Sequence, residues 1–286
     1  MSGPAIAILP YEHRQGRGLS KTPLAALNWP LGCPDRLVGG RIEDMAASDH
    51  LILYPRTRTH FDPRKGVAAQ VSLIMGEPAA IHRKHIALLR VSHRRFFRIL
   101  TFHQSLLDRL GNAVLLPYGT TWVPDWRDLE VTKTRMTSLI ASAKRDSDGH
   151  RLRHAVADWV AEEGRDVDVI GGGYRPFERK SDGLAPYRYS VVIENTREAN
   201  YFSEKLVDAV LCATVPIYWG CPNLDRFFDT AGIIRCESEA DIRRAIETAS
   251  EADYQSRLPH LMALQSEVAR YTDLETRAAE TIREAL

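Results

Sequence analysis

The residues best suited to chemistry lie in one short segment of the second half of the chain. A carboxylate and an amide, Glu194 and Asn195, follow an apolar run that predicts a buried strand. A second carboxylate and a lysine, Glu204 and Lys205, then fall in the first turn of a helix that we expect to begin at Tyr201. Two carboxylates, an amide and a cation are thereby predicted to meet at the end of one strand.

A helix start of this kind can bind an anion. Its free N–H groups and its positive potential favour a phosphate. Lys205 would add a point charge there, and Glu204 could accept hydrogen bonds from the two hydroxyls of a ribose. The same residues also fit a purely structural interpretation, in which Asn200 is the N-cap and Glu204 only favours the first turn. The spacing of the residues alone does not distinguish ligand binding from helix capping.

The elements around this segment alternate between strand and helix, with short connections. Such alternation indicates a parallel sheet covered by helices, in which ligands bind beyond the carboxyl ends of the strands. Strands are expected at 136–141, 167–170, 189–193, 215–218 and 232–234, and helices at 150–162, 201–212 and 239–250.

The first half is less regular, but it also alternates. Its strands are expected at 5–9, 51–54, 71–75, 97–102 and 113–116, and its main helix at 81–91. The alternation of strands and helices becomes more regular after the Pro-containing segment 120–126. We therefore predict an α/β fold with two domains, at 1–128 and 129–258, and a helical tail at 259–286 that packs back on the first domain.

Composition excludes several classes of protein. The chain of 286 residues has 38 Lys and Arg against 37 Asp and Glu, so it lacks the basic excess typical of a nucleic-acid-binding protein. No apolar run is long enough for a membrane span, and the N-terminus does not resemble a secretory signal. Four cysteines without a metal-like or paired spacing are typical of a reducing compartment. We expect a cytoplasmic protein, or one peripheral to the inner membrane.

The segment from Tyr187 to Phe228 resembles the donor-binding domain of the α-1,3/1,4-fucosyltransferases, glycosyltransferase family 10. The order and spacing of its motifs are similar along the whole segment, although Ile193 stands where the family usually has an aromatic residue. The motifs that carry the resemblance are Ile193-Glu194-Asn195, Tyr201, Glu204-Lys205-Leu206, Ala213-Thr214-Val215-Pro216, Gly220-Cys221-Pro222-Asn223 and Phe227-Phe228.

The resemblance implies a GT-B type fold, in which two Rossmann-like α/β domains face a cleft. It also implies an inverting transfer of fucose from GDP-fucose to a hydroxyl of an oligosaccharide or polysaccharide acceptor. The donor would be bound by the second domain and the acceptor by the first. No metal ion and no other cofactor is implied.

The resemblance also assigns roles to residues. An arginine at the start of the helix at 150–162 would contact the donor pyrophosphate; Arg151 is the best match, with Arg145 and Arg153 as alternatives in neighbouring registers. Glu77, which follows the strand at 71–75 in a Gly-Glu-Pro turn, is the candidate general base, with Asp62 and Glu194 as competitors. The donor-binding residues would be Arg151, Glu194, Asn195, Tyr201, Glu204 and Lys205.

Other interpretations stay open at this point. A transferase of the same fold could use another nucleotide sugar, because the sugar pocket cannot be recognised in the sequence. A non-catalytic protein that binds a glycan or a nucleotide is a further alternative. Two Asp-x-Asp strings, Asp146-Ser147-Asp148 and Asp166-Val167-Asp168, are interpreted as a turn former and a strand flank rather than as metal ligands.

Overall fold

The chain forms two compact units in a computed structural model that describes residues 3–13 and 18–286. The first unit consists of residues 1–118 together with 274–286, and the second of residues 119–273. The division thus falls between Tyr118 and Gly119, earlier than the expected boundary at 128. The buried Asp208 carboxylate explains the shift, because it accepts hydrogen bonds from the Thr121 hydroxyl (2.6 Å) and the Trp122 amide (3.0 Å) and holds this segment on the second unit.

The first unit contains a parallel sheet of five strands in the order β1-β2-β3-β4-β5. All five strands lie where short apolar runs predicted them, and the predicted helix at 81–91 is part of a longer one. The strands are β1 (Ile6–Ile8), β2 (His50–Leu53), β3 (Gln70–Met75), β4 (Ile99–Thr101) and β5 (Ala113–Leu115), and the helices are α1 (Ala79–Ser92) and α2 (Gln104–Leu107). Short 3-10 helices occupy Leu19–Lys21, Leu24–Ala26, Asp35–Leu37, Ile42–Asp44, Thr57–His60 and His93–Arg95.

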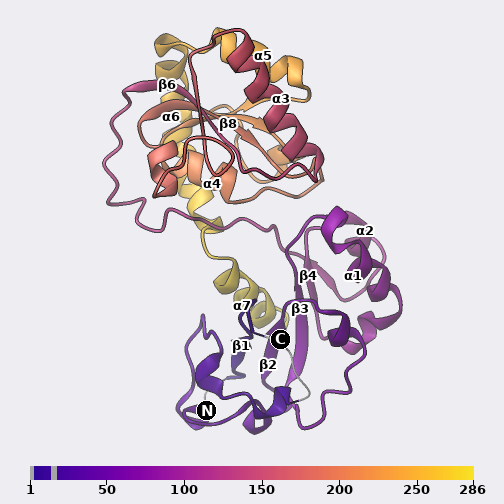
Figure 1. Cartoon of the computed structure of the whole chain (residues 1–286). Coiled ribbons are helices and arrows are strands. Elements are labelled where there is room, and N and C mark those ends of the chain that lie inside the picture. Colours follow the sequence, from indigo (N-terminus) through magenta and orange to yellow (C-terminus); the bar gives the residue numbers. More distant parts are fainter. Residues whose placement is uncertain (1–2, 14–17) are drawn as a thin grey trace. The chain divides into compact units, whose positions relative to one another are not determined.

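One face of this sheet is covered by the end of the chain. Figure 1 shows α7 (Leu274–Glu284) beside β1, which it contacts. Its buried residues Ala278 and Ile282 pack with Ile8 and Ile52 of the sheet. Residues 274–286 thus belong to the first unit, whereas 259–273 belong to the second.

The second unit contains another parallel sheet of five strands, in the order β10-β9-β8-β6-β7. Its strands are β6 (Arg135–Ile140), β7 (Val167–Ile170), β8 (Tyr187–Ile193), β9 (Val215–Trp219) and β10 (Ile234–Arg235). Its helices are α3 (Asp148–Glu162), α4 (Glu204–Leu211), α5 (Glu239–Thr248) and α6 (Glu251–Val268), with 3-10 helices η7 (Lys180–Gly183), η8 (Leu224–Arg226) and η9 (Ala269–Tyr271).

The strand order places a topological switch between β6 and β8. The chain leaves β6 through α3 toward β7, on one side, and leaves β8 through α4 toward β9, on the other. Loops that diverge in this way open a crevice at the carboxyl ends of the two strands, where α/β proteins bind their ligands. The starts of α3 and α4, which follow these two strands, therefore border the crevice. No helix in the described ranges is long and apolar enough to cross a membrane.

Candidate functional site

Helix α4 begins at Glu204 and not at the expected Tyr201. Its N-cap is Ser203, whose hydroxyl accepts from the Lys205 amide, so the prediction of Asn200 as the cap was wrong. Tyr201 is buried just before the helix instead of forming its first turn. The expected pair of Glu204 and Lys205 nevertheless occupies the first turn, because the cap lies directly before it.

Asn200 closes the loop that leads to the helix. Its backbone has a φ of 64°, a left-handed conformation that asparagine tolerates better than most residues. The Asn200 amide donates to the Asn223 side-chain oxygen (2.8 Å), and the Asn223 side-chain amide donates back to the Asn200 side chain (2.9 Å). This reciprocal pair ties the loop to the Gly-Cys-Pro-Asn turn that follows β9.

The fully buried carboxylate of Glu194 anchors the start of α4. One of its oxygens accepts from the Ser203 amide (2.8 Å) and the other from the Ser203 hydroxyl (2.6 Å). Burial raises the pKa of Glu194, while the Lys205 ammonium 3.7 Å away opposes that effect. These contacts give Glu194 a positioning role in the fold, and its direct contact with a ligand stays a prediction.

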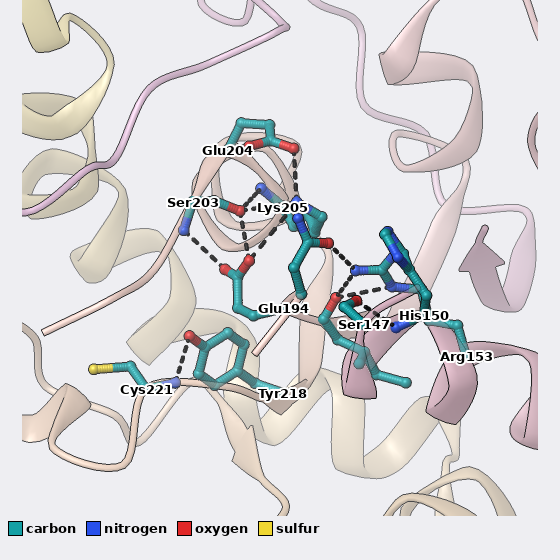
Figure 2. Close-up of polar contacts among 11 residues, drawn as sticks. Ser147, His150, Arg153, Glu194, Ser203, Glu204, Lys205, Tyr218 and Cys221 are labelled. Atoms are coloured by element: carbon teal, nitrogen blue, oxygen red, sulfur yellow. Dashed lines mark hydrogen bonds and ion pairs between the residues drawn. The ribbon is translucent and has the colours of Figure 1, made fainter. Parts of the chain in front are cut away.

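Glu204 and Lys205 form an ion pair at the helix start, as Figure 2 shows. The Lys205 ammonium donates to the Glu204 carboxylate (2.9 Å) and to the Ser203 hydroxyl (3.1 Å). Burial would lower the pKa of Lys205, but the Glu204 and Glu194 carboxylates outweigh it and the pKa is raised. About a fifth of the lysine side chain remains exposed (21%), so the cation is held in place yet can reach a ligand.

Arg153, and not Arg151, is the arginine of α3 that faces the strand end. Arg151 has a side chain that is 60% exposed and pairs with Asp148 on the helix surface. Arg153 is buried and donates to the Ile193 carbonyl from Nε (3.0 Å) and Nη2 (2.7 Å), and to the Asn195 side-chain oxygen from Nη2 (2.9 Å).

The helical pattern of α3 explains this difference. Residues two apart on a helix point in nearly opposite directions. The buried Val156 and Val160 share a face with Arg153, not with Arg151. This apolar spacing was available in the sequence and could have selected Arg153. Arg145, the third alternative, is exposed before the helix begins.

The start of α3 rests directly on the end of β8. Ser147 is its N-cap and accepts from the His150 amide (3.1 Å), and the Gly149 amide donates to the Asn195 carbonyl (3.1 Å). A Cβ on Gly149 would lie 1.7 Å from the Glu194 carbonyl oxygen, so only glycine permits this approach. The contact brings Arg153 and the start of α4 to the same strand end.

Replacement of Gly149 by Ala is expected to separate α3 from the strand end. Because the clash is with backbone, the free energy of unfolding should fall by about 3 kcal/mol or more. Urea unfolding of the full chain measures it. Gly172→Ala is the matched control, since a Cβ there meets nothing within 4 Å. Equal stability of the two variants would contradict the close contact.

The Asp-x-Asp strings both have partners within the protein. In the first, Ser147 caps α3 and Asp146 accepts from His150. In the second, the Asp168 carboxylate accepts from Arg135 (2.6 Å) and from the Tyr187 hydroxyl (2.8 Å). Over the described ranges, no three His, Cys, Asp or Glu residues are grouped so that they could hold a metal ion. Independence from metal stays a prediction.

Glu77 lies in the first unit, beyond the carboxyl end of the central strand β3. It is half-buried and precedes Pro78, the N-cap of α1. A Cβ on Gly76 would lie 2.6 Å from the Tyr118 ring, so this ring packs on the backbone that leads to Glu77. Its competitor Asp62 pairs with Arg58 (2.6 Å), as the arginine-rich loop around it suggested.

Comparison with known proteins finds local sequence similarity to fucosyltransferases. No family model matches the chain. It is 30% identical over 70 residues to the α-(1,3)-fucosyltransferase FucT of Helicobacter pylori, a match that covers 24% of this chain and 15% of that protein. It is 34% identical over 64 residues to a putative fucosyltransferase-like protein of Arabidopsis thaliana, a match that covers 21% of this chain and 12% of that protein. The chain thus matches only a small part of the length of these relatives.

Similarity to solved structures identifies the fold. Anabaena HepE, solved in complex with UDP-glucose, superposes with a TM-score of 0.57 over 83% of this chain and 79% of its own, at 11% sequence identity. The fold is GT-B. The predicted architecture of two Rossmann-like α/β domains is therefore confirmed, and the similarity of the chain is to glycosyltransferases.

Proposed function

We propose that this chain is an inverting, metal-independent glycosyltransferase that moves fucose from GDP-fucose to a hydroxyl of an acceptor glycan. One observation carries the proposal: Arg153, Glu204 and Lys205 converge on the carboxyl end of β8 at the switch point of the sheet. The local similarity to fucosyltransferases supports the choice of donor sugar.

The cations at this strand end suit a diphosphate leaving group. Negative charge grows on GDP as its bond to the sugar breaks, and fixed cations that meet this charge stabilise the transition state. Nη1 of Arg153 makes no hydrogen bond to any residue of the described ranges, so its two N–H groups can bind phosphate oxygens. Lys205 can exchange the Ser203 hydroxyl for a phosphate oxygen. In this proposal Arg153 takes the role first expected of Arg151.

Glu204 is suited to the ribose. The paired Lys205 ammonium outweighs burial and lowers the pKa of Glu204, so the carboxylate stays ionised and accepts hydrogen bonds from hydroxyls. Asn195 completes the same strand end, with its side-chain oxygen bound by Arg153. Tyr201 is buried in the loop before α4, so it contributes to the packing of this loop rather than to a helical turn.

Glu77 is proposed as the general base of the acceptor site in the first unit. In an inverting transfer the acceptor oxygen bonds to the anomeric carbon as the bond to the diphosphate breaks, through an oxocarbenium-like state. The acceptor hydroxyl loses its proton to the base late in this step. A single displacement needs this one carboxylate and no covalent glycosyl-enzyme.

Transfer assays test the proposal directly. Purified protein is incubated with GDP-fucose, GDP-mannose or UDP-glucose and a panel of glycans, and the products are identified by mass spectrometry. We expect fucose transfer from GDP-fucose. Transfer from another donor only would change the donor and keep the reaction class. Tight GDP binding without turnover on any acceptor would favour the non-catalytic alternative.

Lys205→Ala should weaken GDP binding by roughly 1.5–3 kcal/mol, the contribution of a hydrogen bond to a charged group. The reason is that the ammonium is held at the helix start where the diphosphate is proposed to bind. Isothermal titration calorimetry measures the change. Arg165→Ala removes another ion-paired cation of this unit, one that pairs with Glu247, and should leave GDP affinity unaltered. Equal affinities of the two variants would refute the phosphate site.

A further inference from the structure

Helix α1 of the first unit has an outer face that the proposed transfer reaction does not use. Leu89 of α1 and Leu106 of α2 belong to the same core cluster as Leu73 of β3. The next residue of that strand, Ile74, points to the opposite face of the sheet and packs in the cluster that contains α7. Helices α1 and α2 therefore cover one face of the sheet and α7 the other, and the outer side of α1 is exposed (Figure 1).

The segment 78–107, which contains both helices, concentrates positive charge in a chain that is almost neutral. It has six Lys and Arg residues and no Asp or Glu, whereas the whole chain has 38 and 37. Arg83, Arg90 and Arg94 are exposed on the outer side of α1 and directly after it. None of the three forms an ion pair with a residue of the described ranges, so no carboxylate of the protein neutralises them there. Such a patch attracts an anionic partner.

Exposed aliphatic side chains lie on the same face as these cations. Ile81 is 60% exposed and Val91 is 78% exposed. With Lys84 between them they follow the spacing i, i+3 and i+10, which forms one stripe along a helix. Arg83 and Arg90, seven residues apart, lie on the neighbouring stripe. A helix face that combines aliphatic side chains with unpaired cations is typical of helices that bind at the surface of an anionic bilayer.

A cavity of about 310 Å³ lies between the second half of α1 and α2, at the edge of this face. Three apolar and four polar residues line it: Ile86, Leu106 and Leu110, and Arg90, His93, Ser105 and Arg109. Two guanidinium groups at one cavity suit a phosphate group, which each can bind through two N–H groups.

The His93 ring in the wall of this cavity is fixed by Asn112. The Asn112 side-chain amide donates to the backbone carbonyls of His93 and Phe96 (2.9 Å each), so its oxygen accepts from Nδ1 of His93 (3.2 Å). The cavity is thus a formed site beside the cationic face.

We propose that the outer face of α1 docks on a bilayer that contains anionic phospholipids, and that the cavity receives the phosphate of one lipid headgroup. The cations lie over the headgroups, while Ile81 and Val91 enter the boundary between headgroups and acyl chains. A soluble polyanion, such as a nucleic acid or an acidic glycan, would pair with the cations but gain nothing from the aliphatic side chains. A bilayer accounts for both features, and its role here is independent of the proposed transfer reaction.

Flotation of the full chain with lipid vesicles tests the docking. We expect binding to vesicles of phosphatidylcholine mixed with phosphatidylglycerol, little binding to phosphatidylcholine alone, and weaker binding as the salt concentration rises. The double variant Arg83→Gln, Arg94→Gln should bind the mixed vesicles roughly 10–30-fold more weakly, since each basic residue near an anionic surface contributes a factor of about five. Removal of the same charge from two exposed arginines of the second unit, Arg127→Gln with Arg244→Gln, should leave binding unchanged.

Two further double variants test the parts of the face separately. Arg90→Gln with Arg109→Gln should lose more affinity than the other pair of the first unit, because these two arginines also line the cavity. Ile81→Gln with Val91→Gln should weaken binding about 5–20-fold through lost apolar contact with the bilayer. Val38→Gln is the matched control for the aliphatic pair, since Val38 is 71% exposed elsewhere in the first unit.

Each result supports or overturns a stated part of the proposal. Equal binding to vesicles with and without phosphatidylglycerol, or equal losses in the variants of the two units, would overturn the docking surface. Full binding by the variant of Ile81 and Val91, together with tight binding of duplex DNA, would assign the face to a soluble polyanion instead. Equal losses in the two arginine pairs of the first unit would overturn the headgroup pocket. The substituted side chains are exposed except where they line the cavity, and thermal unfolding of each variant confirms that it is folded.

Discussion

Glu77→Gln is expected to lower kcat by about 10²–10⁴-fold, the usual contribution of general acid–base catalysis, and to leave GDP affinity unchanged. The amide preserves the shape of the side chain but cannot accept the proton of the acceptor hydroxyl. GDP binding should persist because the proposed donor residues belong to the other unit. The acid limb of the pH profile of kcat/KM should also disappear in the variant. Steady-state kinetics over a range of pH, with calorimetry of GDP, measure all three effects.

Asp62→Asn is the matched control for this variant. Asp62 is a carboxylate of the same unit, but its oxygens already accept from Arg58 and from the Arg64 amide. We expect its turnover to stay near that of the wild type. Normal turnover in Glu77→Gln, combined with its loss in Asp62→Asn or in Glu194→Gln, would transfer the role of base to one of those residues. The argument for the donor site would be unaffected.

Arg153→Met should weaken GDP binding by about 2–4 kcal/mol, because truncating one partner of a buried charged contact leaves the other unpaired. The variant loses the proposed phosphate contacts of Nη1 and also the bonds that hold Asn195 and the Ile193 carbonyl. Arg153→Lys keeps the charge without the fork of donors, so its GDP affinity should lie between those of the wild type and of Arg153→Met. Calorimetry with GDP, alongside thermal unfolding, measures the series.

Arg151→Met is the comparison that decides the register. Arg151 lies on the same helix and pairs with Asp148 in solvent, so its loss should change GDP affinity little. A larger effect of Arg151→Met than of Arg153→Met would restore the original assignment of the pyrophosphate to Arg151. A folded Arg153→Lys with wild-type affinity would show that the fork of donors is not used.

Sequence reasoning located the strands of the first unit because each is a short apolar run bounded by polar residues. It misplaced the start of α4, because Tyr201 and Phe202 have the apolar character of a helix face although they lie outside the helix here. Ser203, followed by Glu204 and Lys205, was the better capping signal. The sequence also contained the information to choose Arg153 over Arg151, because Val156 and Val160 share a helix face with Arg153.

Other features could not be predicted from local pattern. Asp208 lies within an apolar helical run, and its role depends on Thr121, which is distant in sequence. Its burial raises its pKa to about 6. A cavity lined by residues 122–125 and 177–181 is likewise formed by two segments that sequence periodicity does not relate. Contacts of this kind follow from tertiary packing and become visible only in the folded chain.

The return of α7 to the first sheet makes that unit discontinuous along the chain. Ile8 and Ile52 pack against Ala278 and Ile282, which follow the whole second unit in the sequence, whereas residues 119–273 form their unit without interruption. During translation the second unit can therefore complete its core before the first one does, although it is encoded later. The apolar face of the sheet that carries Glu77 has its cover only once α7 has been made, so the first unit depends on a segment that follows the second.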